Sequence, residues 1–226
     1  MDIHFEEASA RYEGRTALEP LTLRLTERRI GVIGLNGSGK TTFARLINGL
    51  VKPSSGRVVV NGFDTVKESE AVRAEVGFIF QNPQNQIILP ILKEDIALGL
   101  KRKKLSKTDR DTAVAAVLAR FGIAHLADRR THELSGGELQ LSAFASVLVT
   151  EPEILILDEP TNQLDLKNRN LMERTMAGMA ENLIVVSHDL ALVEGFDRVL
   201  LFSQGRLIGD GKPDAVIAQY RTLAGA

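Results

Sequence analysis

The chain has 226 residues, of which 44% are hydrophobic and 25% charged, and its formal net charge is -1. This composition is typical of a folded chain with one substantial core, and it gives no overall attraction to nucleic acid or anionic lipid. The absence of cysteine excludes disulfides, thiolate catalysis and sulfur-ligated zinc sites. No apolar stretch approaches the roughly 20 residues that span a bilayer, and the polar first residues predict no signal peptide.

Short runs with strand character occur along most of the chain. Residues 21–25 alternate between apolar and polar side chains, the apolar residues 30–33 follow, and residues 57–60 lead into the turn pair Asn61-Gly62. Because helical stretches separate most of the later runs, we expect a largely parallel sheet in an α/β fold. These later buried strands are predicted at residues 76–80, 154–157, 183–186 and 199–202.

The middle of the chain has a different pattern. Between Gln81 and Leu134 the strand signals disappear, and residues 108–120 carry apolar side chains at helical spacing. We interpret this region as a helical insert. No repeat of roughly 20 to 50 residues and no low-complexity linker divides the chain.

A glycine-rich octapeptide, residues 34–41, follows the apolar run at 30–33 and opens a helix-like stretch. This order of strand, loop and helix is typical of a phosphate-binding P-loop, in which glycines let backbone N–H groups surround phosphates. Lys40 would place a charge on the terminal phosphates, and the Thr41 hydroxyl would ligate magnesium. The predicted nucleotide-binding residues here are Gly34, Leu35, Asn36, Gly37, Ser38, Gly39, Lys40, Thr41 and Thr42.

Kinases, GTPases, helicases and transport ATPases all have a P-loop, so residues elsewhere must separate them. The apolar run at 154–157 leads directly into Asp158 and Glu159, which places both carboxylates at the carboxyl end of a buried strand, where α/β sheets bind ligands. Asp158 suits a magnesium shell, and Glu159 is suited to accept a proton from an attacking water. Two solvated acids at a strand end are the alternative interpretation, which the P-loop disfavours.

Residues 134–140, the signature segment, precede a helical run that ends near Val149. Within the segment, Ser135 and Glu138 have capping-box spacing. Gly136 and Gly137 would leave N–H groups at the helix N-terminus open to an anion. A capped helix without a ligand is the alternative, and capping and phosphate binding can coexist.

These motifs in this order resemble the ATP-binding cassette (ABC) ATPases over nearly the whole chain. The resemblance adds Tyr12, which would stack on adenine, and Gln81, which would link the magnesium site to the helical insert. It also implies that Asp165, in the segment 162–165, crosses a dimer interface. His188, after the strand at 183–186, would contact the γ-phosphate and position the water together with Glu159. A packing tyrosine and a structural histidine are the alternatives.

The resemblance implies a P-loop NTPase (RecA-like) core with an antiparallel β subdomain and an inserted α-helical subdomain. We expect one cassette over residues 1–226, with the nucleotide-binding core at 1–81 and 150–226 and the helical subdomain at 82–149. Two cassettes would stack head to tail with ATP and Mg²⁺ between them, so hydrolysis would need a homodimer. The implied catalytic residues are Glu159, His188 and Gln81, the implied metal ligands are Thr41, Gln81 and Asp158, and the signature residues on the partner's nucleotide are Ser135, Gly136, Gly137 and Glu138.

Two residues depart from the commonest pattern of the family. Glu138 stands where the family usually has Gln, and Leu141 replaces a frequent Arg. Glutamate preserves capping, but its carboxylate should repel a terminal phosphate unless it turns back toward the helix. We therefore expect these changes to affect dimer closure rather than the identity of the site.

The segment from Phe80 to Ile88, with residues 94–97, resembles the docking segment of energy-coupling factor (ECF) importers of vitamins and metals. Gln84 and Asn85 stand where acids are frequent, so docking of a basic coupling helix would rely on other acids, such as Glu94 or Asp95.

The loop at 34–37 and the segment at 162–165 most resemble the biotin-type ATPases of that group, and a cobalt or nickel type or another ABC importer is the alternative. A soluble ABC ATPase acting on nucleic acid or ribosomes is the alternative of another class. The compact insert disfavours it, because repair ATPases carry a long coiled coil and translation factors usually carry two cassettes. The implied partners are a transmembrane coupling (T) protein and a substrate-binding membrane (S) protein, with no nucleic acid, at the cytoplasmic face of the inner membrane.

Overall fold

The computed structural model describes residues 1–162 and 164–225. The chain separates into two compact units, and each is described by itself. The core unit comprises Met1–Phe78, Glu153–Pro160 and Ala180–Ala226, and the helical unit comprises Ile79–Pro152 and Thr161–Met179. The segment 161–179, which the sequence places with the nucleotide-binding core, groups with the helices here, and the subdomain bounds predicted from the sequence remain a prediction.

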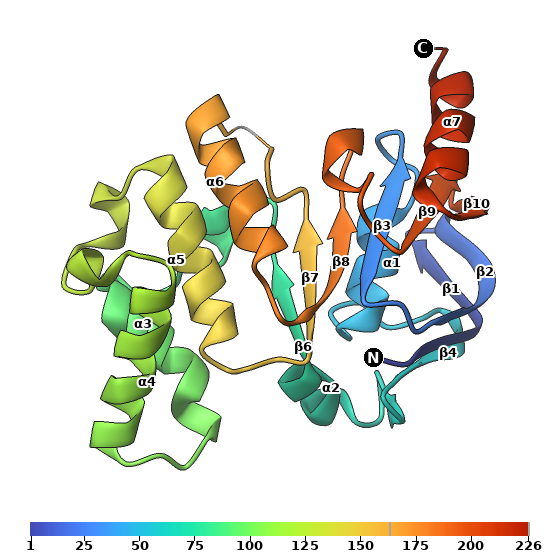
Figure 1. The fold of residues 1–226 in the computed structure, drawn as a ribbon. Coiled ribbons are helices and arrows are strands. Elements are labelled where there is room, and N and C mark those ends of the chain that lie inside the picture. Colours follow the sequence, from blue (N-terminus) through green and yellow to red (C-terminus); the bar gives the residue numbers. More distant parts are fainter. Residues whose placement is uncertain (163, 226) are drawn as a thin grey trace. The chain divides into compact units, whose positions relative to one another are not determined.

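A six-stranded sheet forms the centre of the core unit (Figure 1). Its strand order is β10-β9-β3-β8-β7-β6. The pairs β3 with β9, β3 with β8 and β7 with β8 are parallel, and β10 is antiparallel to β9. The strands are β3 (Arg29–Gly34), β6 (Val76–Ile79), β7 (Ile154–Asp158), β8 (Asn182–Val186), β9 (Arg198–Ser203) and β10 (Arg206–Gly211).

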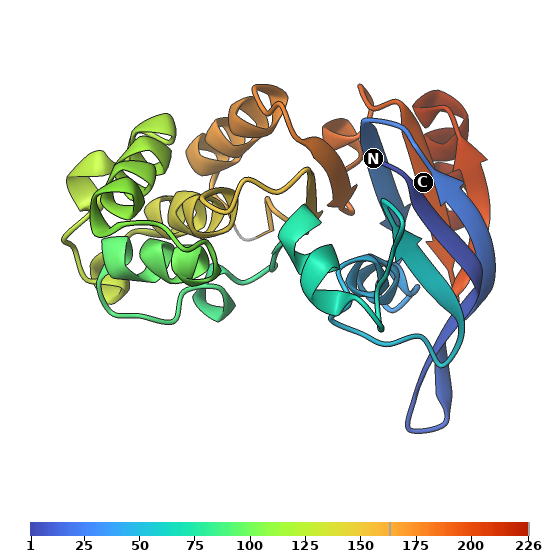
Figure 2. The same ribbon diagram turned by 90° about the horizontal axis from the view of Figure 1, so that it is seen from below.

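A second, antiparallel sheet of the core unit has the order β2-β1-β4-β5. Its strands are β1 (Ile3–Tyr12), β2 (Arg15–Leu25), β4 (Ser55–Val60) and β5 (Phe63–Asp64). Figure 2 shows α1 (Lys40–Ile47) beside this sheet. Phe43 of α1 stacks on Phe5 of β1 with ring centroids 4.8 Å apart, and it also contacts Phe202 of β9 at 4.9 Å. The buried face of α1 therefore joins the two sheets through aromatic contacts.

The remaining helices of the core unit are α2 (Ser69–Glu75) and α7 (Pro213–Ala224), and α7 packs on β3, β9 and β10. The helical unit contains α3 (Leu92–Gly99), α4 (Lys107–Arg120), α5 (Gly136–Leu148) and α6 (Leu166–Ala177). Within it α5 contacts both α3 and α4, and Phe144 of α5 meets Phe121 edge to face at 6.1 Å. The N-cap Ser135 fixes the start of α5, and the N-cap Ser106 fixes the start of α4.

The predicted strands are confirmed, with the run at 76–80 ending at Ile79. The helix expected at 108–120 forms as α4, and the mixed α/β architecture with an antiparallel sheet and helical parts is confirmed. Strands β1, β5 and β10 were not predicted. Within the described part of the chain, none of the helices combines the length and hydrophobicity needed to cross a bilayer.

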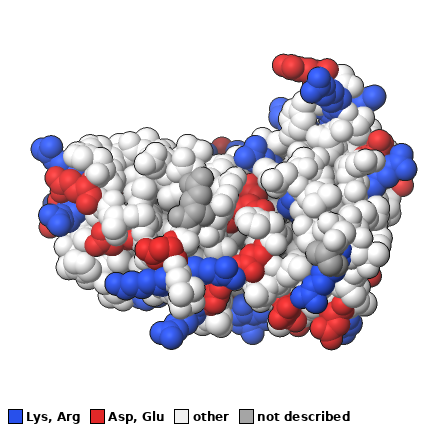
Figure 3. All heavy atoms as spheres, turned by 90° about the horizontal axis from the view of Figure 1, so that it is seen from above, with Lys and Arg blue, Asp and Glu red and all other residues white. Residues whose placement is uncertain are grey.

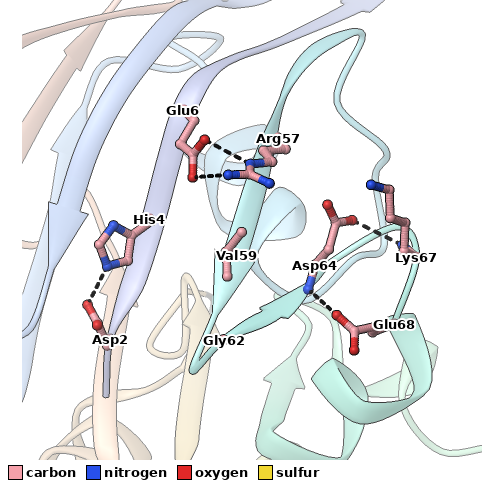
Figure 4. Close-up of a pocket in the computed structure, with 9 residues that line it drawn as sticks. All are labelled: Asp2, His4, Glu6, Arg57, Val59, Gly62, Asp64, Lys67 and Glu68. Carbon is pink, nitrogen blue, oxygen red and sulfur yellow. Dashed lines mark hydrogen bonds and ion pairs between the residues drawn. The ribbon is translucent and has the colours of Figure 1, made fainter.

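The outward face of the antiparallel sheet carries a 490 Å³ groove lined mainly by charged side chains (Figure 4). Arg57 on β4 makes a bidentate ion pair with Glu6 on β1, with distances of 2.8 and 2.9 Å. His4 Nε2 lies 2.8 Å from Asp2 Oδ1. Arg57 and Glu6 thus neutralise one another within the groove.

Candidate nucleotide-binding site

The P-loop lies between the end of β3 at Gly34 and the start of α1 at Lys40. Lys40 is buried, and its ammonium group Nζ donates to the carbonyl of Gly34 at 2.7 Å and to that of Leu35 at 3.0 Å. Burial lowers the pKa of Lys40, while the carboxylates of Glu159 and Asp158 act to raise it. The loop thus holds a cation on its own carbonyls, facing two acids.

Two glycines of the P-loop are required by close approach of the backbone. A Cβ at Gly34 would overlap the carbonyl oxygen of Phe202, and one at Gly39 would lie 2.6 Å from the carbonyl oxygen of Ala17. Gly39 has φ 102°, in the left-handed region that strains other residues. The loop is therefore packed against neighbouring backbone, and substitution of either glycine would displace it.

Ser38 fits a phosphate-binding role. Its hydroxyl is buried and has no hydrogen-bond partner among the described residues. A buried hydroxyl without a partner costs free energy, which a ligand oxygen would recover. Thr42 is half-buried on the first turn of α1, and the predicted loop residues Leu35, Asn36 and Gly37 are exposed.

The structure brings Thr41 and Asp158 together. The Thr41 hydroxyl donates to Asp158 Oδ1 at 3.0 Å, and Asp158 is buried at the end of β7. Burial raises the pKa of Asp158, and the hydrogen bond from Thr41 opposes this rise. Mg²⁺ prefers oxygen ligands, and at nucleotide sites the protein provides only one or two of them while phosphates and waters provide the others. The Thr41 hydroxyl and the Asp158 carboxylate therefore fit the implied metal.

Glu159 and His188 also lie together. Nδ1 of His188 lies 2.7 Å from Glu159 Oε2, and the His188 backbone N–H donates to the same oxygen at 3.3 Å. The Glu159 backbone has φ 52°, and its N–H donates to the Val186 carbonyl at 2.9 Å. A non-glycine residue in this left-handed region is strained and persists where its surroundings fix it. The carboxylate is thus held by the strand end that carries the histidine.

Arg45 is a residue at this site that the sequence analysis missed. It lies one helical turn after Thr41 on α1, and its charge lowers the pKa of Asp158. Its buried Nε has no hydrogen-bond partner in the described part of the chain. The spacing of four residues places Thr41 and Arg45 on one face of the helix. This spacing could have predicted Arg45 at the site from the sequence.

In the helical unit, the signature segment forms the predicted capping box at the start of α5. Glu138 Oε2 accepts from the Ser135 backbone N–H at 2.8 Å and from the Ser135 hydroxyl at 2.7 Å. These hydrogen bonds, that of the hydroxyl first, lower the pKa of Glu138. The Glu138 carboxylate therefore turns back toward the helix start. In this orientation it is not expected to repel a terminal phosphate.

Gly137 of the signature segment contacts α6. A Cβ at Gly137 would overlap the side-chain amide of Asn168, a residue that sequence reasoning missed. The Asn168 backbone N–H donates to Asp165 Oδ1 at 2.8 Å, so the predicted interface residue Asp165 is the N-cap of α6. Gly136 is exposed and has open space around it. Gln163, two residues before Asp165, lies outside the described residues.

Two further predicted residues lie on the surface. Tyr12 is 46% exposed at the end of β1, opposite Arg15, so its ring is available to a base. Gln81 is exposed after β6, in the helical unit. The stacking role of Tyr12 and the linking role of Gln81 remain predictions.

One expectation for the docking segment is wrong. Asp95 is not a surface acid, because it is buried and its Oδ1 accepts from the N–H groups of Ile88 at 2.7 Å and Leu89 at 2.8 Å. It thereby fixes the loop before α3, where Ile88 is 74% exposed. Glu94, the other acid expected there, is exposed.

The P-loop between β3 and α1, with the two acids at the end of β7, defines a nucleotide-binding cassette of the P-loop class. A family model described as ABC transporter matches residues 18–162. The chain belongs to the ABC transporter family, and as such it binds ATP and is an ATPase.

Three known proteins illustrate this relationship. The biotin transport ATP-binding protein BioM of Rhizobium etli is 64% identical over 99% of this chain and 100% of its own length. The energy-coupling factor transporter ATP-binding protein EcfA1 of Halalkalibacterium halodurans is 37% identical over 87% of this chain and 73% of its own. A dimeric structure of the ATP-binding cassette MJ0796 with ADP and Pi matches with TM-score 0.84 and 25% identity, over 93% of this chain and 98% of its own. The chain is therefore an ATPase subunit of the ABC/ECF importer type.

Proposed function

We propose that this chain drives uptake of biotin, as a head-to-tail homodimer on a membrane-embedded transporter. The observation that carries the substrate assignment is the 64% identity to a biotin transport ATP-binding protein over the full length of both chains. The observation that carries the mechanism is the set of contacts made by Lys40, Thr41, Asp158, Glu159 and His188 in the core unit.

The core unit binds and prepares the nucleotide. Lys40 leaves the carbonyls of the P-loop for the terminal phosphates, and the unpartnered Ser38 hydroxyl gains a phosphate oxygen. Thr41 and Asp158 would hold Mg²⁺, which when bound screens the charge of the phosphates. Burial raises the pKa of Asp158, and the charge of Arg45, like the hydrogen bond from Thr41, acts against this rise.

Glu159 is the general base in this proposal. A base must lie within hydrogen-bond reach of the proton it accepts, and His188 holds the Glu159 carboxylate in one position at the end of β8. When ATP is bound, His188 contacts the γ-phosphate and Glu159 accepts a proton from the attacking water.

The second half of each site comes from another copy of the chain. The exposed Ser135 and Gly136 at the start of α5 would cover the γ-phosphate held by the P-loop of the partner copy, with the N–H groups of the helix start directed at the anion. Asp165, the exposed N-cap of α6, would cross the same interface. The dimeric state of the relative with ADP and Pi supports the pairing of two cassettes.

The docking segment, residues 80–97, would bind the T protein, and an S protein would supply the biotin site, at the cytoplasmic face of the inner membrane. Ile88 offers an exposed apolar contact and Glu94 an exposed acid. No nucleic acid partner is proposed, because the net charge is -1. On the face drawn in Figure 3, Asp and Glu lie on both sides of the Lys and Arg side chains and among them.

The experiment is affinity purification of the tagged chain from its native membrane in mild detergent, with mass spectrometry of the proteins and small molecules recovered. We expect two membrane proteins and biotin. Ile88→Ser should abolish this recovery, whereas Ile208→Ser, which changes an exposed isoleucine on β10, should not. Recovery of a conventional permease pair would contradict the ECF assignment, and recovery of ribosomes or DNA-repair proteins would contradict the transport function.

A further inference from the structure

We propose that Glu138 is a latch on the signature segment, which occupies the Ser135 hydroxyl in the open cassette and must release it before the dimer closes on ATP. This inference rests on the proposed head-to-tail dimer and deepens it. It assigns to the glutamate a positioning role that opposes closure.

The geometry of the latch is a hydrogen-bonded ring at the start of α5. The carboxylate oxygen Oε2 of Glu138 accepts from both the hydroxyl (2.7 Å) and the backbone N–H (2.8 Å) of Ser135, and the Glu138 N–H donates back to the Ser135 hydroxyl oxygen at 3.4 Å. A serine hydroxyl carries one proton. While that proton is donated to Glu138, it is not available to a phosphate oxygen.

The charge of Glu138 strengthens the latch in two ways. A hydrogen bond to an ionised acceptor is roughly twice as strong as one between neutral groups. The same hydrogen bonds lower the pKa of Glu138, so the carboxylate is ionised at neutral pH. The groups whose charges also act on it are His125 and Arg129. An incoming γ-phosphate therefore meets a Ser135 whose proton points to a neighbouring anion.

Closure changes one bond of this ring. The Ser135 hydroxyl turns from Glu138 to the γ-phosphate of the partner's nucleotide, and the Ser135 backbone N–H can remain on Glu138. The cost of closure is thus the loss of one charge-assisted hydrogen bond, because the carboxylate itself stays turned back on the Ser135 N–H at the start of α5. The capping box persists, so α5 keeps its start.

The test compares Glu138→Gln with the unchanged chain, both in a Glu159→Gln background that blocks hydrolysis. Glutamine can still accept from the Ser135 N–H and so keeps the cap, but it is neutral. We expect the protein concentration for half-maximal dimerisation with ATP to fall about tenfold, the effect of one charge-assisted hydrogen bond. Sedimentation equilibrium measures the dimer, and a fluorescent ATP analogue measures binding to the monomer, which should stay unchanged.

Glu133→Gln is the matched control, because it removes the same charge five residues earlier on an exposed side chain whose ion-pair partner is Arg129 at 3.9 Å. It should leave dimerisation unchanged. A second comparison repeats Glu138→Gln with Ser135→Ala also present. The latch predicts that the gain disappears there, because no hydroxyl remains to be released.

Three results would overturn the latch. Dimerisation unaffected or weakened by Glu138→Gln would mean that Glu138 does not oppose closure. A gain that persists with Ser135→Ala would reduce the effect to charge repulsion alone. If the Glu159→Gln chain forms no dimer with ATP at any concentration, the proposed dimer itself fails and the latch with it.

Discussion

The P-loop region and the signature segment both carry serine and glycine at a helix N-terminus, yet they are built differently. The P-loop is packed on backbone from β2 and β9, and its lysine is buried. In the signature segment Ser135 and Gly136 are exposed, and the polar groups bond within the segment. The first region is a site prepared by the core of its own chain. The second is an exposed helix start whose polar groups cap it, and in the proposed dimer it would meet the nucleotide of the partner copy.

Substitutions in the first region should therefore act within one chain, and substitutions in the second should act only through the dimer of two chains. Changes at the P-loop and at the acids after β7 should alter nucleotide binding or hydrolysis by every cassette. Changes in the signature segment should leave binding to a single cassette intact and alter dimer closure.

The largest effect is expected from Glu159→Gln. Loss of a general base lowers turnover by about 10²- to 10⁴-fold. Glutamine has the same shape and can keep a hydrogen bond to His188, so ATP affinity should change little. Steady-state phosphate release and equilibrium ATP binding, measured on the same preparation, separate the two. Turnover equal to that of the unchanged chain would contradict the assignment of Glu159 as the base.

Lys40→Ala should reverse this pattern by weakening ATP binding itself. The substitution removes a buried cation that the loop carbonyls hold in place, and we expect about a 10²-fold loss of affinity and of activity. Isothermal titration with ATP measures the affinity. Lys67→Ala, at an exposed lysine outside the loop, is the control and should bind ATP normally.

The signature segment can be tested through its packing on α6. An added methyl group in Gly137→Ala would overlap the amide of Asn168, and overpacking of this kind costs about 1 to 3 kcal/mol. Thermal unfolding should show the loss, and Asn168→Ala in the same chain should restore most of it. Gly136→Ala is the matched control, since nothing lies near its Cβ and its stability should be unchanged or raised. An equal loss in both variants would contradict the contact.

The sequence predicted the P-loop, the acids of β7 and the capping box because each depends on neighbours in the chain. Asn168 behind Gly137 could not be predicted, because their contact joins two helices distant in sequence. The burial of Asp95 was also missed. Its carboxylate binds backbone N–H groups of residues 88 and 89, and a surface acid has the same local pattern. Strand β1 was missed because its alternation is interrupted by register shifts between Phe5 and Arg11.

The smallest effect is expected far from both regions, in the groove on the antiparallel sheet (Figure 4). Arg57 and Glu6 form a bidentate pair there, but both side chains are about half exposed. Exposed ion pairs contribute little because water and salt screen them, so Arg57→Ala should move the unfolding temperature by no more than about 4 °C. Calorimetry in low and high salt measures this shift. A large, salt-sensitive fall in the unfolding temperature would contradict this expectation. It would mean that the ion pair in the groove stabilises the antiparallel sheet in addition to the aromatic contacts of α1.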